Sequence, residues 1–128
     1  ERAALRMSEL PISVVLITNG RNPSLLRHVV RSWLALGCEV VCVGRVAELS
    51  VIAGIGATDL RLLPRPHGPL DYGVNFEAGR LAASRANVVH AADDVLPCGG
   101  DWHAALAAPA NALVALRLTS VLGQRWGD

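Results

Sequence analysis

Short apolar runs, rich in β-branched residues, recur along the chain and are separated by longer segments of mixed polarity. Each run is short, as is typical of strands that are buried on both faces of a parallel sheet. The runs predict strands over residues 12–18, 39–43, 60–63, 87–91 and 112–118. The last segment, 119–128, can turn back as one more strand.

The intervals between these runs carry apolar residues at three- and four-residue steps, the spacing that gathers them on one face of a helix. Asn22 can cap the first helix, which has Pro23 in its first turn, and Gly37 can end it. Asp71 can cap a later helix that has Tyr72 on its apolar face. The pattern predicts helices over residues 23–36, 46–53, 72–83 and 102–108.

The alternation of strands and helices predicts an α/β fold with three layers: a mostly parallel, Rossmann-like sheet with helices on both faces. We expect residues 11–128 to form this single domain and residues 1–10 to be a polar tail. Apolar residues make up 52% of the chain and charged residues 18%, which excludes a disordered chain. Aromatic residues make up only 4%, so Val, Leu, Ile and Ala must build the core.

The charge pattern argues against binding to nucleic acid or to a membrane surface. The net charge is +1, and the arginines, Arg61 and Arg85 among them, are scattered singly along the chain. Nucleic acids and anionic membranes require a concentrated basic face. No apolar run reaches the roughly 18 residues of a membrane-spanning helix.

The cysteine pattern favours reduced thiols. Cys38 and Cys42 lie four residues apart on one predicted strand, a separation of about 13 Å at about 3.3 Å per residue. A disulfide requires Cα atoms within about 7 Å, so these two residues cannot pair. We therefore expect a cytoplasmic protein.

Three segments should meet at the carboxyl edge of the predicted sheet, where ligands of such folds bind. They are residues 18–21, 64–71 and 91–97. The last contains two adjacent carboxylates, Asp93 and Asp94, which repel each other unless a cation or a proton separates them. This predicts a divalent metal, Mg or Mn. The alternative is that Asp94 caps a turn while Asp93 faces the solvent.

Several of these segments together resemble family 2 glycosyltransferases of the GT-A fold. The resemblance rests on the strand that ends in Thr18-Asn19, on the helix that starts from Asn22 and on the helix that carries Asn75 and Gly79. It also rests on the stretch 88–97, with its acidic pair and following proline, and on Trp102. The resemblance extends from residue 11 to the end of the chain.

The resemblance implies a nucleotide-diphosphate sugar as the donor, a Mn or Mg ion, and transfer of the sugar with inversion by a general base on the acceptor side. Asp93 and Asp94 would hold the metal. No residue is assigned as the catalytic base. The implied donor-binding residues are Thr18, Asn19, Gly20, Arg21, Arg65, Asn75 and Asp93.

The chain also departs from the family pattern. The first acid of the metal motif falls on Ala91 or Ala92, and Gly44-Arg45 follows the second strand where the family has an acid, with Glu48 nearby. The acceptor half of the family normally follows the fifth strand. These departures keep open a non-catalytic or degenerate donor-binding domain that needs another segment or partner for activity.

Several of these residues also have a purely structural interpretation. Residues 19–21 can form an ordinary turn, Arg65 and His67 can belong to a solvated loop, and His90 is expected to be a core histidine. A zinc site from His90, Asp93 and His103 lacks the usual ligand spacing. A nucleotidyltransferase is disfavoured because the chain has no Lys. A plain scaffold and a homo-oligomer remain open.

Overall fold

The computed structural model describes residues 9–65, 71–97, 118–119 and 125–126. The chain forms two compact units, Glu1–Cys98 and Gly99–Asp128. The predicted helix over 102–108 and all but the last residue of the predicted strand over 112–118 lie outside the described residues, as do His67 and His103.

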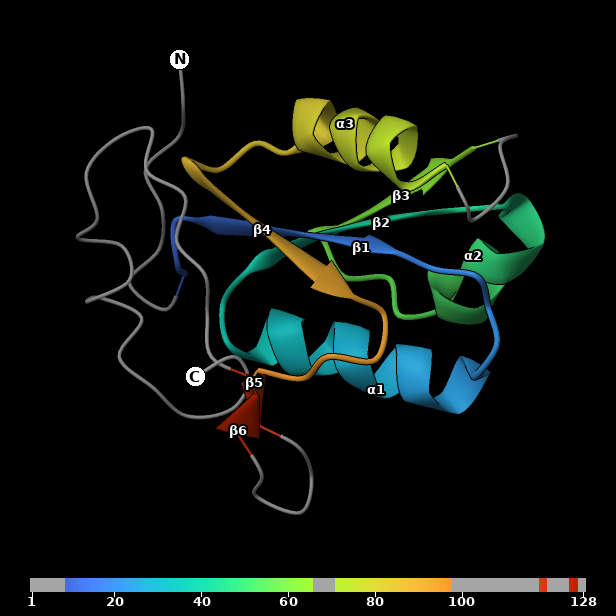
Figure 1. Cartoon of the computed structure of the whole chain (residues 1–128), viewed down its shortest axis with the longest axis horizontal. Coiled ribbons are helices and arrows are strands. Elements are labelled where there is room, and N and C mark those ends of the chain that lie inside the picture. Colours follow the sequence, from blue (N-terminus) through green and yellow to red (C-terminus); the bar gives the residue numbers. More distant parts are fainter. Residues whose placement is uncertain (1–8, 66–70, 98–117, 120–124, 127–128) are drawn as a thin grey trace. The chain divides into compact units, whose positions relative to one another are not determined.

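The first unit contains a four-stranded parallel sheet with the strand order β3-β2-β1-β4 (Figure 1). Each of the four strands predicted for this unit is present, with its ends displaced by at most one residue. The strands are β1 (Ile12–Ile17), β2 (Glu39–Gly44), β3 (Leu60–Pro64) and β4 (Asn87–Ala92). β1 and β2 are buried along their whole length, as expected of central strands.

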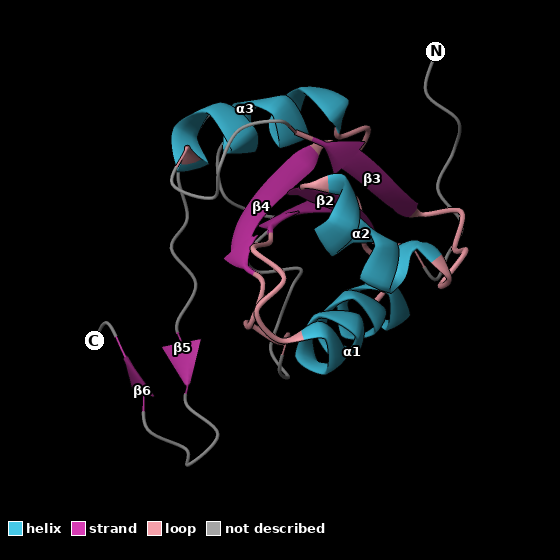
Figure 2. Cartoon of the chain, turned by 90° about the vertical axis from the view of Figure 1, so that its right-hand side faces the viewer, coloured by secondary structure: helices cyan, strands magenta, loops and turns pink. Residues whose placement is uncertain are grey.

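Helices cover both faces of this sheet, which confirms the three-layer α/β fold. The helices are α1 (Pro23–Ala35), α2 (Val46–Ala53) and α3 (Tyr72–Ala82). Figure 2 shows α3 on one face of the sheet and both α1 and α2 on the other. The core beneath α3 is formed by Val15, Ile17, Val41 and Val43, with Phe76 packed against it.

The predicted boundaries of α1 are confirmed by its capping contacts. The side chain of Asn22 accepts a hydrogen bond from the amide of Leu25 at 3.1 Å, and Pro23 lies in the first turn. Gly37, just beyond the helix, has a φ of 101°, in the left-handed region that favours glycine. Asp71 occupies the N-cap position of α3, but within the described residues its side chain makes no capping hydrogen bond.

A close approach at Gly79 determines which strands α3 covers. A Cβ atom at this position would lie 2.5 Å from Cγ1 of Val15 and 3.1 Å from Cγ2 of Val43. The helix therefore rests on β1 and β2, as its packing against these two strands confirms. β4 is left at the edge of the sheet, beside this helix.

The position of α3 corrects two predictions. His90 is exposed and stacks on Phe76, with ring centroids 4.4 Å apart, because its strand lies at the sheet edge. It is not a core histidine. Tyr72 is not on the packing face of the helix: it is the first residue of α3 and 51% of it is exposed.

The second unit is described only at two short strands, β5 (Leu118–Thr119) and β6 (Arg125–Trp126). They pair in antiparallel register, Leu118 with Trp126 and Thr119 with Arg125. A return strand within 119–128 is therefore present. None of the helices in the described part of the chain is long and apolar enough to cross a membrane.

Candidate functional site

The strand order creates a switch point between β1 and β4. From β1 the chain adds β2 and β3 on one side, and then crosses over to place β4 on the other side. In open α/β sheets of this kind, the crevice outside the carboxyl ends of the two strands at the switch point is the usual ligand site. The loops that follow β1 and β4 are those in which the sequence places Thr18 to Arg21 and the acidic pair.

The structure brings Thr18 and Asp93 into contact at this point. Ile17 pairs with Ala92, so the next residue of each strand lies beside the other. The hydroxyl of Thr18 donates a hydrogen bond to Oδ2 of Asp93 at 3.0 Å and accepts one from the amide of Gly20 at 3.1 Å. Gly20 has a φ of 69°, which lets the chain turn back over the hydroxyl.

The remaining residues of this loop form a turn. Oδ1 of Asn19 accepts a hydrogen bond from the amide of Arg21 at 3.1 Å, a short polar turn of the kind that asparagine favours. Arg21 is exposed. A turn of this kind is compatible with either interpretation of residues 19–21. A role for Asn19, Gly20 and Arg21 in binding a nucleotide remains a prediction.

Asp94 lies in the turn that follows β4 and is exposed, whereas Asp93 is half-buried. The turn is closed by a hydrogen bond from the amide of Val95 to the carbonyl of Ala92 at 3.2 Å. The carbonyl of Val95 accepts a hydrogen bond from Nε1 of Trp33 at 3.0 Å, which ties the turn to α1. Trp33 itself is buried.

A third carboxylate, Glu48, approaches from α2. It accepts a hydrogen bond from the amide of Arg45 at 2.8 Å, and its Cγ lies 3.0 Å from where a Cβ on Gly20 would be. The pKa of the Cys42 thiol is raised to about 12 because the thiol is buried and because the charges of Asp93 and Glu48 disfavour the thiolate. Both acids therefore lie near the carboxyl end of β2. The sequence signal for Glu48 is its place in the first turn of the helix after that strand.

Arg65 and Asn75 belong to the segments that follow the carboxyl end of β3. Arg65 follows β3, three strand spacings, or roughly 14 Å, from β4. Its amide donates to the carbonyl of Gly44 at 2.9 Å, and within the described residues its buried Nε has no hydrogen-bond partner. Asn75 is buried in the first turn of α3. No described hydrogen bond joins either residue to Asp93.

Asp93 and Asp94 fit a divalent cation only if a bound ligand and water supply the remaining oxygen atoms around the cation. Within residues 9–65 and 71–97, no three His, Cys, Asp or Glu side chains gather as a metal site. His103, the third residue of the zinc alternative, lies outside these ranges. Magnesium and manganese, by contrast, can be held by one or two carboxylates together with water and diphosphate oxygens. Among the described contacts, neither Asp93 nor Asp94 forms an ion pair with an arginine.

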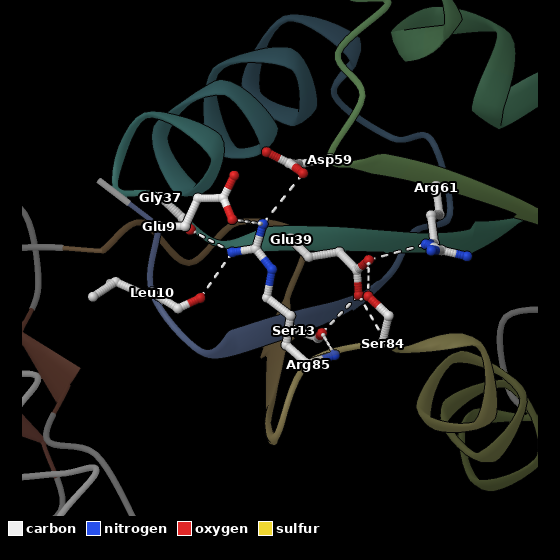
Figure 3. A network of polar contacts seen from close by, with 9 residues as sticks. All are labelled: Glu9, Leu10, Ser13, Gly37, Glu39, Asp59, Arg61, Ser84 and Arg85. Atoms are coloured by element: carbon white, nitrogen blue, oxygen red, sulfur yellow. Dashed lines mark hydrogen bonds and ion pairs between the residues drawn. The ribbon is translucent and has the colours of Figure 1, made fainter. Parts of the chain in front are cut away.

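The opposite, amino edge of the sheet holds a polar network that the sequence did not reveal (Figure 3). The carboxylate of Glu39 accepts four hydrogen bonds: from the hydroxyl of Ser13 at 2.7 Å, from Nε of Arg61 at 3.0 Å, and from the amide and hydroxyl of Ser84 at 2.9 and 2.6 Å. Burial raises the pKa of Glu39, but the hydrogen bonds, those from Ser84 foremost, outweigh burial and lower it.

Arg85 forms the other half of this network. Its buried guanidinium donates to the carbonyls of Leu10 and Gly37, and lies 3.2 Å from Oδ1 of Asp59 and 4.0 Å from Oε2 of Glu9. Its amide donates to the Ser13 hydroxyl that also bonds Glu39, which joins the two halves. These groups satisfy one another, so the amino edge is a structural element of the fold.

Comparison with known proteins found no matching family model, no matching curated protein and no matching solved structure. The class is therefore defined by the fold alone: a three-layer α/β protein with a Rossmann-like strand order. Within it, polar side chains gather at the switch point.

Proposed function

We propose that this chain binds a nucleotide-diphosphate sugar at the carboxyl ends of β1 and β4, as the donor-binding part of a glycosyltransferase. The observation that carries the proposal is the hydrogen bond between Thr18 and Asp93, which joins the two loops of the switch point. The resemblance of the first strand, α3 and the acidic stretch to family 2 glycosyltransferases supports the choice of ligand.

In this proposal, Asp93 and Asp94 hold a divalent cation, Mn or Mg. The cation would neutralise the charge that develops on the leaving diphosphate. Arg21 is exposed beside the same loop and would add positive charge there. The acceptor oxygen forms a bond to the anomeric carbon from the face opposite the diphosphate, so the sugar is transferred with inversion. The acceptor proton passes to a base on the acceptor side.

The other donor-binding residues would act from the two sides of the switch point. Asn19 and Gly20 would present the backbone of the first loop to the nucleotide. Asn75, in the first turn of α3, is as buried as Thr18 and would support the site without direct contact with the nucleotide. Arg65 follows β3, three strands away from β4. It would therefore contact only a part of the ligand that extends toward β3. The free, buried thiols of Cys38 and Cys42 support a reducing, cytoplasmic location for this activity.

Calorimetric titration tests the proposal. UDP-, GDP- and dTDP-sugars are added to the protein with and without manganese, and at least one should bind in a metal-dependent manner. Asp93→Asn should abolish that binding because it removes the fixed carboxylate. Glu77→Gln is the matched control, since it removes one charge from an exposed pair with Arg80 on α3. If none of these donors binds in a metal-dependent manner, the proposal is refuted.

A second candidate is a donor-binding domain without catalysis of its own. It is favoured by Ala91, which is buried in β4 at one of the two positions where the family motif has its first acid. A site with one fewer carboxylate would bind the diphosphate but stabilise its departure less. Donor binding without sugar transfer or donor hydrolysis, with acceptors supplied, would favour this candidate over the first.

A further inference from the structure

We propose that Thr18 is a positioning residue that orients the carboxylate of Asp93 toward the donor. This inference rests on the proposed function and assigns Thr18 a role different from direct contact with the nucleotide sugar. Thr18 is 2% exposed, so its side chain has almost no surface for a ligand. Its hydroxyl nevertheless contacts the half-buried acid of the switch point.

The backbone and the methyl group of Thr18 hold its hydroxyl in place. The amide of Thr18 donates to the carbonyl of Val43 at 2.9 Å, which continues the sheet ladder one residue beyond β1. Its Cγ2 lies against Gly44, so closely that a Cβ there would be 2.9 Å away. A side chain fixed by packing and by the ladder is a suitable support for a second polar group.

The hydrogen-bonding capacity of the hydroxyl fixes the direction of its contacts. A threonine hydroxyl has one hydrogen to donate. The amide of Gly20 can only donate to it, so the hydroxyl hydrogen is directed to Oδ2 of Asp93. Among the described residues, this hydroxyl is the one hydrogen-bond partner of the Asp93 side chain. Oδ1 is thereby left for the cation or for the donor.

The supporting contact should matter for ligand affinity in the way that outer-shell partners of metal ligands do. Without the hydroxyl, the carboxylate of Asp93 can rotate about its Cα–Cβ and Cβ–Cγ bonds. Binding must then fix this side chain, and the lost conformational entropy reduces the binding free energy. Substitutions of such partners typically reduce metal affinity by about 10- to 100-fold. We expect an effect at the lower end, because one hydrogen bond is involved.

The test compares Thr18→Val, which removes the hydroxyl at nearly constant shape, with Thr18→Ser, which retains it. Manganese-dependent binding of UDP, GDP and dTDP is measured by calorimetry for both variants and the unchanged protein. Thr18→Val should weaken metal-dependent binding about tenfold, and Thr18→Ser should restore it to within about twofold. Binding without metal should be unchanged, whereas general loss of structure would weaken both.

A second measurement does not require a ligand. The amide of Gly20 is protected from hydrogen exchange by the Thr18 hydroxyl, so Thr18→Val should accelerate its exchange while Thr18→Ser does not. Equal exchange in all three proteins would overturn the inference. Thr18→Ala serves as the hydroxyl-free variant if Thr18→Val does not fold.

The outcomes separate this inference from the proposed function. If the unchanged protein binds a nucleoside diphosphate with manganese and Thr18→Val binds it equally well, the positioning role is wrong and the proposed function stands. If the unchanged protein binds none of the three with metal, the proposed function fails, and the positioning role toward a donor fails with it. In that case the exchange of Gly20 still shows whether the Thr18 hydroxyl accepts the Gly20 amide.

Discussion

The two edges of the sheet use their charged residues in opposite ways. At the amino edge, Glu39 accepts four hydrogen bonds and Arg85 contacts two carbonyls and two carboxylates. At the carboxyl edge, the described contacts of the Asp93 side chain amount to one hydrogen bond, from Thr18. The hydrogen-bonding capacity of Glu39 and Arg85 is used within the fold, whereas Oδ1 of Asp93 has no described hydrogen bond.

The difference indicates which edge stabilises the fold and which edge keeps hydrogen-bonding capacity for the proposed ligand. A buried charge without partners is costly, so the groups of the amino edge must be paired as soon as the strands come together. A half-buried acid with an unused oxygen is tolerated because water or a ligand can complete its hydrogen bonds. Substitutions at the two edges should therefore separate effects on folding from effects on ligands.

The largest effect on stability is expected for Arg85→Met. It removes a buried cation whose side chain is 6% exposed and leaves Asp59 and two carbonyls without that partner. We expect a loss of about 3 kcal/mol in the free energy of unfolding, measured by urea denaturation. Arg80→Met, at an exposed ion pair, is the control and should cost far less. Equal costs would show that the amino edge is not the stabilising one.

A smaller, pH-dependent effect is expected for Glu39→Gln. The folded pKa of Glu39 is lower than its ordinary value, so the stabilisation is complete above the ordinary pKa of about 4.3 and is lost as the pH falls through the folded pKa. At pH 7 the variant should be less stable by about 2 kcal/mol. At pH 3 the difference in unfolding free energy between the variant and the unchanged protein should be smaller.

Urea denaturation at both pH values measures this difference. Glu77→Gln removes an exposed carboxylate and is the control, which should leave the pH dependence of unfolding nearly unchanged. A gap between Glu39→Gln and the unchanged protein that is the same at both pH values would contradict the assignment.

The smallest effect on stability is expected for Asp93→Asn. The substitution retains an acceptor for the Thr18 hydroxyl and removes a charge that has no described ionic partner. The free energy of unfolding should change by less than about 1 kcal/mol. Thermal unfolding of the purified variant measures the change. A loss as large as that of Arg85→Met would make the carboxyl edge structural and remove the contrast between the edges.

Most of the fold could be predicted because its signals are local. Four apolar runs indicated the four strands of the first unit, and Asn22 and Gly37 marked the ends of α1. The place of each strand in the sheet is not encoded in its own sequence. His90 was therefore expected in a core strand, although β4 lies at the edge and α3 rests on β1 and β2.

The candidate site was predictable only in part. Thr18 and Asp93 could be placed at one sheet edge because parallel strands end there, but the contact between them depends on the pairing of β1 with β4. The amino-edge network was missed for a related reason. Its members, such as Glu39 and Ser84, lie 45 residues apart, and single charges in a sequence are normally interpreted as solvated.

The bond from the Trp33 indole to the main chain at Val95 has a consequence for sequence variation. Its acceptor is a backbone oxygen, which every residue type provides. The side chains of the turn beyond the acidic pair can therefore be exchanged while the tether to α1 is retained. Replacing the indole would remove this hydrogen bond even if the new ring filled the same volume. The side chains of the turn can therefore vary, whereas Trp33 of α1 cannot be replaced without loss of the tether.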